Sequence, residues 1–312
     1  MTDPSADGEC MKSGDRTLWQ REMEEIRRKF AERVANAASL ESDALRAAFA
    51  AVRREDFVGP GPWQIMRSAD ISEGYEQTPD ANPVHLYDLV TVALDPERLL
   101  NNGEPASLAR WLDQLAIRSG TRFLHVGSGV GYYTAIVAQA VSRAGYVLAL
   151  EVDPTLAQRA ARNLADWSNI EVRCAPGPES SDGPFDAIFV NAGATDLDMS
   201  WLDRLSERGR LLVPLTVSLP EEELGFGQML LVERSDSYWP ARFVGPVGIF
   251  HCKGARSERG EQLLRASFGS RKEGLVASLR RDPHSLDPEC WLHAASFCLS
   301  KRSPSPNGQT HH

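Results

Sequence analysis

Three glycines at every second position form the most informative motif of this 312-residue chain, Gly127-Ser128-Gly129-Val130-Gly131. An apolar run precedes the motif at 122–126, and a helix-compatible segment follows it at 132–144. Glycine permits a tight turn and close approach of a ligand, and free N–H groups at a helix N-terminus favour a carboxylate or a phosphate. The motif therefore predicts a nucleotide-like cofactor bound at Gly127, Ser128, Gly129 and Gly131.

The spacing of these glycines distinguishes two classes of cofactor. Dinucleotide-binding turns carry G-x-G-x-x-G, which accommodates a pyrophosphate, whereas this chain has G-x-G-x-G. The shorter form suits the methionine moiety of S-adenosyl-L-methionine. Either cofactor requires an acidic residue after the next strand to accept hydrogen bonds from ribose hydroxyls, and the run 146–151 ends on Glu151, followed by Val152. We predict S-adenosyl-L-methionine as the cofactor, with an NAD-dependent dehydrogenase as the alternative.

The elements around the motif alternate between short apolar runs and helical segments. Strands are expected at 122–126, 146–151, 170–174, 186–191 and 210–214, with helices at 132–144, 156–167 and 199–205. This alternation is typical of an α/β fold with a doubly wound, mostly parallel sheet. Strands at 229–233 and 243–250 are expected to add a late antiparallel hairpin. Asn191 ends its strand, where open α/β sheets bind ligands, and is a further candidate cofactor contact.

Changes of pattern divide the chain into four expected parts. Residues 1–62 hold an N-terminal tail and a helical segment, with helices at 16–37 and 39–52, and residues 63–104 form an irregular lid or substrate loop. Residues 105–252 form the S-adenosylmethionine-binding domain, which starts with a helix at 105–115. Residues 253–312 form a C-terminal extension with helices near 261–266 and 272–280 and a disordered tail.

Composition limits the partners and the compartment. A formal net charge of −9 argues against a broad grip on a nucleic-acid backbone. No apolar run reaches the roughly 18 residues that span a bilayer, and the N-terminus lacks a signal-peptide core. We therefore expect a cytoplasmic protein with neither a nucleic-acid nor a membrane partner. The cysteines are odd in number and lack C-x-x-C spacing, which predicts neither a disulfide scaffold nor a metal site: Cys10, Cys174, Cys252, Cys290 and Cys298.

Several segments together resemble the protein-L-isoaspartate O-methyltransferase family of class I S-adenosylmethionine-dependent methyltransferases. The likeness spans about residues 52–217 and rests on the glycine turn and on VRREDF at 52–57, NGEPAS at 102–107, FDAIFVNAG at 185–193 and GRLLVP at 209–214. The resemblance implies a Rossmann-like fold and carboxyl methylation of a peptide or protein. In that family a G-Q-T-I-S-Q-P segment carries a serine implicated in catalysis, and the matching segment 103–109 keeps it as Ser107.

The chain departs from the family pattern at two places. The Gln-Thr pair of the family is Glu104-Pro105 here, and the later Gln-Pro is Leu108-Ala109. These changes predict an altered acceptor. After the third strand the family has Gly-Asp-Gly, whose Asp contacts the cofactor near adenine, whereas this chain has Pro176 at the Asp position. Adenine must therefore be held in another way, such as by apolar packing.

The residues and the resemblance together predict an O-methyltransferase that acts on a carboxylate of a peptide or protein, such as a modified peptide natural product. A carboxylate nucleophile needs no general base, so Ser107 is expected to position the acceptor; its alternative is a first-turn helix serine without substrate contact. The other candidate substrate-facing residues are Asn102, Gly103, Glu104, His85 and Tyr87.

Two alternative functions remain open from the sequence. One is methylation of a small-molecule hydroxyl or amine, for which His85 would serve as the base because histidine titrates near neutrality. The other is a cofactor-binding protein that has lost catalysis and acts as an interaction module through its C-terminal extension.

Overall fold

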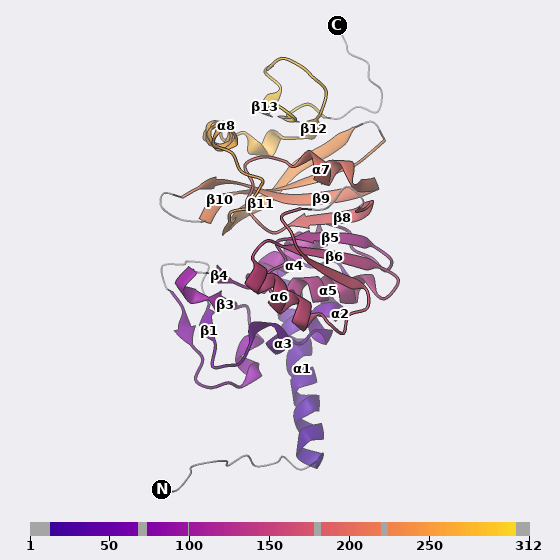
Figure 1. Cartoon of the computed structure of the whole chain (residues 1–312), viewed down its shortest axis with the longest axis vertical. Helices are drawn as coiled ribbons and strands as arrows, with labels where there is room; N and C mark the ends of the chain where they lie inside the picture. Colours follow the sequence, from indigo (N-terminus) through magenta and orange to yellow (C-terminus); the bar gives the residue numbers. More distant parts are fainter. Residues whose placement is uncertain are drawn as a thin grey trace.

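A ten-stranded mixed sheet forms the body of the molecule, with strands in the order β13-β14-β12-β11-β10-β9-β8-β5-β6-β7 (Figure 1). The computed structural model describes residues 13–67, 74–98, 100–177, 182–219, 224–236 and 238–303. The parallel strands are β5 (Arg122–Val126), β6 (Tyr146–Glu151), β7 (Ile170–Cys174), β8 (Phe185–Val190) and β9 (Leu205–Ser218). Strands β10 (Leu224–Glu233) and β11 (Trp239–Phe250) continue the sheet antiparallel. The predicted doubly wound sheet with a late hairpin is confirmed.

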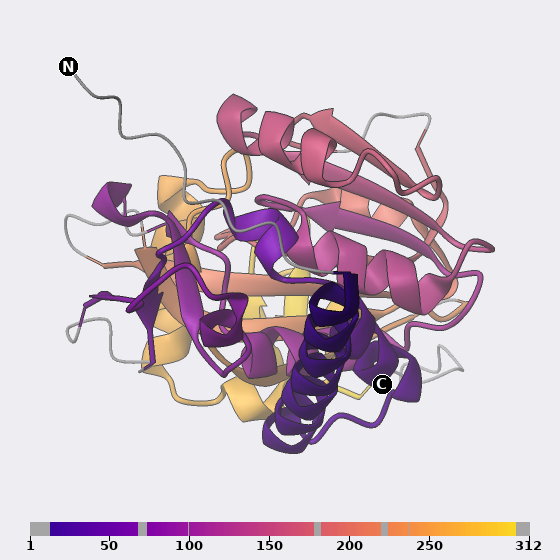
Figure 2. The same ribbon diagram turned by 90° about the horizontal axis from the view of Figure 1, so that it is seen from below.

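Helices cover both faces of the parallel strands, which explains why the central strands β5, β6 and β8 are mostly apolar. Phe123 and Phe189 pack on one face, and their strand neighbours Leu124 and Ile188 pack on the other, because successive side chains alternate. The first face carries α1 (Ser13–Ala38), α2 (Asp43–Ala51), α4 (Pro105–Asp113), α5 (Tyr132–Val141) and residues of α6 (Pro154–Asn163). The second carries α7 (Met199–Asp203) and α8 (Glu258–Gly269). Figure 2 shows the molecule from the end at which α1 lies.

The N-terminal helices begin and end where local chemistry requires. The expected second helix starts at Asp43 rather than Ser39, because Ser39 has a φ of 53° and the Ser42 side chain accepts a hydrogen bond from Leu45 N–H as an N-cap. A short helix, α3 (Glu55–Val58), occupies part of the expected break at 53–61. The helices of this segment share one hydrophobic core with α5.

The segment 63–104 contains a small sheet, which corrects the expectation of an irregular loop. Its strands pair in the order β2-β1-β3-β4. They are β1 (Gln64–Met66), β2 (Glu76–Gln77), β3 (Thr91–Asp95) and β4 (Leu100–Asn101), with 3₁₀ turns η2 (Pro83–Leu86) and η3 (Pro96–Arg98). Such short strands leave no visible period in the sequence. The small sheet has a core of its own around Trp63, Ile65 and Leu86.

The buried side chain of Arg54 connects this small sheet to the helices. Its guanidinium is 0% exposed and donates hydrogen bonds to the carbonyl oxygens of Leu86 at 2.7 Å and Val90 at 2.6 Å. It also donates to Asn102 Oδ1 at 3.3 Å. The phenyl ring of Phe30 lies 6.0 Å from the guanidinium carbon, within the range of a cation–π contact. A buried cation is thus satisfied largely by backbone carbonyl groups.

The C-terminal extension adds a helix and three strands to the far end of the sheet. Helix α8 forms around the expected stretch 261–266. The helix expected near 272–280 is wrong, because the chain forms the 3₁₀ turn η4 (Glu273–Leu275) and then β12 (Ser278–Arg280), which pairs with β11. Strands β13 (Cys290–His293) and β14 (Cys298–Ser300) complete the edge. In the described part of the chain, no helix is both long and apolar enough to cross a bilayer.

Replacing Arg54 should destabilise the protein far more than replacing its neighbour Arg53. Arg54→Met leaves the Leu86 and Val90 carbonyl groups buried without their charged donor, so we expect a loss of about 3 kcal/mol in the free energy of unfolding. The side chain of Arg53 is 57% exposed and forms ion pairs with Glu55 and Asp56, so Arg53→Met should cost about 0.5 kcal/mol or less. Urea unfolding measures both, and equal losses would contradict this assignment.

Candidate active site

A cavity of about 990 Å³ lies where the glycine turn, the start of α4, the small sheet and the β10–β11 hairpin meet. Its lining includes Gly127, Ser128 and Gly129 at the carboxyl end of β5, and Glu151 and Val152 at the end of β6. The carboxyl ends of neighbouring parallel strands share one edge of a sheet, so their loops converge on a common crevice. The lining also includes four more sequence-predicted residues from the ends of other elements: Asn191, Asn102, Gly103 and Glu104.

The glycine turn has the backbone conformation that its sequence predicts. Gly127, Gly129 and Gly131 have φ angles of 78°, 58° and 92°, which residues other than glycine rarely adopt. Gly131 does not line the cavity: it caps α5, and a Cβ there would lie 2.7 Å from Leu164 Cδ1. Helix α5 has no side-chain cap, so its first backbone N–H groups remain available near the cavity. The Ser128 hydroxyl is buried without a hydrogen-bond partner.

The Glu151 carboxylate, at the end of the neighbouring strand β6, is hydrogen-bonded to the glycine turn. Glu151 is 7% exposed, and its Oε2 accepts a hydrogen bond from Gly129 N–H at 2.7 Å while its Oε1 accepts one from Asp153 N–H at 3.0 Å. Burial raises the pKa of Glu151 above its ordinary value, and the hydrogen bonds from backbone N–H groups oppose that shift. The carboxylate therefore has a fixed orientation beside the glycine turn, and each oxygen retains lone pairs for a further donor.

The residues after β6 and β7 supply the apolar part of this region. Val152 and Leu156 line the cavity, and so do Ala175 and Pro176 after β7. Asp153 caps α6 by accepting hydrogen bonds from the N–H groups of residues 155 and 156, so its carboxylate is already engaged. The expectation of apolar packing around adenine at Pro176 is compatible with this lining. The free donors of α5, the unpaired Ser128 hydroxyl and the Glu151 carboxylate fit S-adenosyl-L-methionine.

The first turn of α4 borders the same cavity on another side. Ser107 is half-buried and lines the cavity, and its backbone N–H donates to Glu104 Oε2 at 2.7 Å. The other Glu104 oxygen accepts from Ala106 N–H at 2.9 Å, so Glu104 is the N-cap of α4. Gly103 O accepts a hydrogen bond from Tyr133 OH at 3.1 Å. The capping role thus belongs to Glu104, and the side chain of Ser107 is not required for it.

Two of the predicted substrate-facing residues lie outside this cavity, which corrects the expectation that they face the same site as Ser107. His85 and Tyr87 line a separate cavity of about 360 Å³. The Nε2 atom of His85 lies 2.9 Å from Asp80 Oδ1. Tyr87 is 2% exposed, and its hydroxyl donates to the Glu55 carboxylate. Burial raises the pKa of Tyr87. Turn η2 directs both residues toward α1 and α3, and sequence proximity alone could not indicate this.

The β10–β11 hairpin contributes cavity residues that sequence reasoning missed. Phe226 on β10 lines the cavity and is 48% exposed, and Lys253 after β11 is exposed at the cavity. Trp111 on α4 also lines it. The predicted strands at 229–233 and 243–250 did not include Phe226 or Lys253, so these residues were not expected at the site. Their signal in the sequence, an aromatic residue and a lysine at the ends of late strands, is too common to be specific.

A model of the protein-L-isoaspartate(D-aspartate) O-methyltransferase family matches residues 25–224 of the chain. The protein-L-isoaspartate O-methyltransferase of Thermotoga maritima is 28% identical over 250 residues, which cover 76% of this chain and 70% of that protein. Protein-L-isoaspartate O-methyltransferase 1 of Syntrophobacter fumaroxidans is 32% identical over 180 residues, which cover 56% of this chain and 71% of that protein.

Solved structures agree with the fold. A protein-L-isoaspartate O-methyltransferase superposes with a TM-score of 0.59 at 21% identity, over 82% of this chain and 72% of the other. A Plasmodium falciparum protein assigned to the same enzyme class, solved with S-adenosyl-L-homocysteine, superposes with a TM-score of 0.53 at 19% identity, over 73% of this chain and 98% of the other. The expected fold class and S-adenosyl-L-methionine as the cofactor are confirmed.

The affinity for S-adenosyl-L-homocysteine should depend on the charge of Glu151. Glu151→Gln removes a charged acceptor for ribose hydroxyls, so we expect binding to weaken about tenfold to a hundredfold. Wild-type affinity should fall as the pH is lowered through the raised pKa of Glu151, because protonation removes the same charge. The variant should lose this pH dependence. Calorimetric titration at several pH values measures both effects.

Glu104→Gln provides a matched control for this experiment. Glu104 also lines the cavity and also accepts two backbone N–H hydrogen bonds, but it lies on the α4 side. We expect this variant to bind S-adenosyl-L-homocysteine within about twofold of wild type. Equal weakening in the two variants would assign the loss to general disruption of the cavity.

Proposed function

The chain belongs to the protein-L-isoaspartate(D-aspartate) O-methyltransferase family of S-adenosylmethionine-dependent enzymes, and from this premise we propose that it methylates a carboxylate of a peptide or protein. The acceptor differs from a plain isoaspartyl residue, and a modified peptide natural product is one candidate. The observation that carries this proposal is the joint lining of one cavity by Ser107, on the acceptor side, and by the glycine turn and Glu151, on the cofactor side.

The cofactor side rests on three groups of the chain. S-adenosyl-L-methionine supplies a methyl group activated by a positively charged sulfur. We propose that the first N–H groups of α5 bind its methionine carboxylate and that Glu151 accepts hydrogen bonds from its ribose. Val152 and Pro176 pack against its base, and Asn191 contacts it at the end of β8. Water exclusion and alignment are then the main tasks of the protein, because the displacement needs a nucleophile in line with the methyl group.

The acceptor side suits an anionic group carried on a larger molecule. Glu104 and Asp153 line the cavity, but both carboxylates are engaged as helix caps. The Lys253 ammonium is exposed at the cavity and can attract an anionic acceptor. The exposed ring of Phe226 offers an apolar contact elsewhere in the cavity. A peptide acceptor could use this contact for a part of the chain that is not methylated. A carboxylate that is already ionised needs no base, and His85, the base expected for a hydroxyl or amine acceptor, lines the other cavity.

The altered first turn of α4 supports a change of acceptor within the family. Glu104 and Pro105 replace the Gln-Thr pair of the family pattern. Glu104 fixes the helix start through its two hydrogen bonds, and Pro105 occupies the first helical position, where its missing N–H costs nothing. The change at Glu104 removes a neutral hydrogen-bonding side chain from the cavity wall, and Pro105 removes another beside it. An acceptor bound through those side chains in other members must therefore be held differently.

Transfer of labelled methyl groups tests the chemical class of the acceptor. The protein is incubated with S-adenosyl-L-methionine labelled in the methyl group and with three probes: an isoaspartyl peptide, its aspartyl counterpart and a pool of cellular peptides. We expect label on peptides of the pool that mild base releases as methanol, because carboxyl methyl esters hydrolyse in base. Label that resists base would indicate an ether or an N-methyl product and contradict the proposal. Rapid turnover of the isoaspartyl probe would contradict the altered acceptor.

Removing the Ser107 hydroxyl should slow the reaction without weakening cofactor binding. If Ser107 positions the acceptor, Ser107→Ala should lower kcat by about tenfold, the equivalent of one hydrogen bond, and leave the affinity for S-adenosyl-L-homocysteine unchanged. Ser200 is a matched control, because it also lies in the first turn of a helix and its N–H also donates to an acidic N-cap. Ser200→Ala should retain full activity. An unchanged kcat in Ser107→Ala would restrict Ser107 to a helical role.

A further inference from the structure

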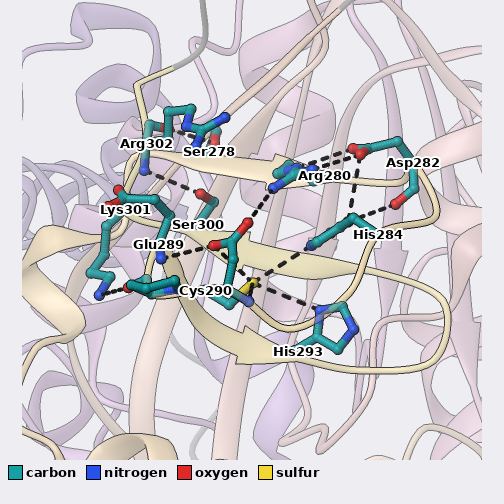
Figure 3. A network of polar contacts seen from close by, with 12 residues as sticks. Ser278, Arg280, Asp282, His284, Glu289, Cys290, His293, Ser300, Lys301 and Arg302 are labelled. Atoms are coloured by element: carbon teal, nitrogen blue, oxygen red, sulfur yellow. Dashed lines mark hydrogen bonds and ion pairs between the residues drawn. The ribbon is translucent and has the colours of Figure 1, made fainter. Parts of the chain in front are cut away.

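The C-terminal extension brings four potential metal ligands together at the edge of the sheet opposite β7, and none of the four lines the methyltransferase cavity. They are His284, Cys290, His293 and Cys298, and one ligand atom from each lies within 4.8 Å of all the others. Figure 3 shows the rings of His284 and His293 directed at the sulfur of Cys290 from two sides. Cys298 is 1% exposed, and the other three residues are half-buried.

The distances within this cluster match those around a tetrahedral ion. Cys290 Sγ lies 3.6 Å from His284 Nε2 and 3.8 Å from His293 Nδ1. In a tetrahedral zinc site with Zn–S near 2.3 Å and Zn–N near 2.0–2.1 Å, sulfur and nitrogen ligands are roughly 3.5 Å apart. The side chains could thus bind an ion with little rearrangement. A disulfide alone would not account for the two imidazoles, since it would use only the two sulfurs.

The backbone of the β13–β14 hairpin produces this convergence. His293 and Cys298 are directly opposed in the ladder, so their side chains lie on the same face. Cys290 and His293 are three residues apart, and in a regular strand they would point to opposite faces. The register shifts between Cys290 and Leu292, and such an irregularity allows both side chains to face the same side.

Hydrogen bonds to neighbouring residues orient His284 and Cys290, as outer hydrogen bonds commonly do for the ligands of a metal site. His284 Nδ1 lies 2.8 Å from the carbonyl oxygen of Asp282, which places the ring proton on Nδ1 and leaves the Nε2 lone pair directed at Cys290. Asp282 is in turn held by Arg280 at 2.6 Å. The backbone N–H of Asp287 donates to Cys290 Sγ at 3.5 Å and helps to fix the position of the sulfur.

We propose that His284, Cys290, His293 and Cys298 bind one zinc ion. Two thiolates and two imidazoles in a tetrahedral arrangement are a ligand set typical of zinc, and four protein ligands leave no open position for catalysis. The ion ties the segment 281–289, which has no regular secondary structure, to the hairpin at the edge of the sheet. The site is structural, and it stands independently of the methyl acceptor.

Metal analysis of the full-length protein tests the site. The protein is purified without an affinity tag and without a chelator, and zinc is measured per chain by plasma mass spectrometry. We expect about one zinc per chain in the wild type and at least a tenfold loss in Cys290→Ser and in His293→Asn. Cys174→Ser and His85→Asn are matched controls that change an exposed thiol on β7 and a histidine of η2, and both should retain the metal.

Cobalt exchange identifies the ligands independently of zinc content. Co²⁺ bound in place of zinc should give sulfur-to-cobalt charge-transfer absorption and intense tetrahedral d–d bands in the wild type. The charge-transfer intensity should fall in Cys290→Ser and disappear in Cys290→Ser/Cys298→Ser. If the cysteine variants do not fold, as circular dichroism would show, His284→Asn keeps both sulfurs and should weaken cobalt binding at least tenfold.

Three results would overturn the proposal. They are an absence of zinc in a folded wild type that also gives no cobalt spectrum, a disulfide between Cys290 and Cys298 in the protein as isolated, and equal zinc content in the wild type and in all ligand variants. Removal of zinc should lower the melting temperature, since a ligand that binds only the folded state stabilises it. The affinity for S-adenosyl-L-homocysteine should remain within about twofold, so failure of the zinc site and failure of the methyltransferase function are distinguishable.

Discussion

The hydrogen bond from Gly129 N–H to the Glu151 carboxylate is the constraint on which the site depends. It joins the loops after β5 and β6, and it places a charged group where the side chain is only 7% exposed. Burying a carboxylate is unfavourable unless donors compensate, and here two backbone N–H groups supply that compensation. The turn could not donate in this way without glycines at positive φ. The same hydrogen bond therefore holds the glycine turn in place and orients the carboxylate that we propose binds the cofactor.

The acceptor side depends on a second buried charge. Arg54 binds the carbonyl groups that lead into β3, and Asn102 accepts from both Arg54 and Val92 N–H just before α4 begins. The small sheet and the first turn of α4, which carries Ser107, are thus held by one network. Because a buried guanidinium requires all of these acceptors together, the network fixes the wall of the cavity opposite the glycine turn. This wall contains one of the two places at which the chain departs from the family pattern, Glu104-Pro105.

The sequence predicted the central parallel strands closely because β5, β6 and β8 are apolar runs buried on both faces. Strands β5, β6 and β7 have the expected bounds. Ser107 and Glu151 could be predicted as residues of one site because a motif accompanies each of them, and both line the cavity. The small sheet of 63–104 could not be predicted, since three of its four strands, β1, β2 and β4, have only two or three residues and show no period. The side of the molecule on which His85 and Tyr87 lie is set by the Arg54 network, which no local pattern records. The cluster at Cys290 needs an irregular hairpin and a distant histidine, so its spacing resembles no common metal motif.

We propose that one cavity holds the methyl donor at the glycine turn and the acceptor beside Ser107. A crystal structure of the complex with S-adenosyl-L-homocysteine tests it most directly, through the position of the cofactor sulfur. We expect the homocysteine carboxylate at the start of α5, the ribose hydroxyls on Glu151 and the sulfur directed toward the part of the cavity that Ser107 lines. A complex with the sulfur directed away from Ser107, or with the ribose held by a residue other than Glu151, would contradict it.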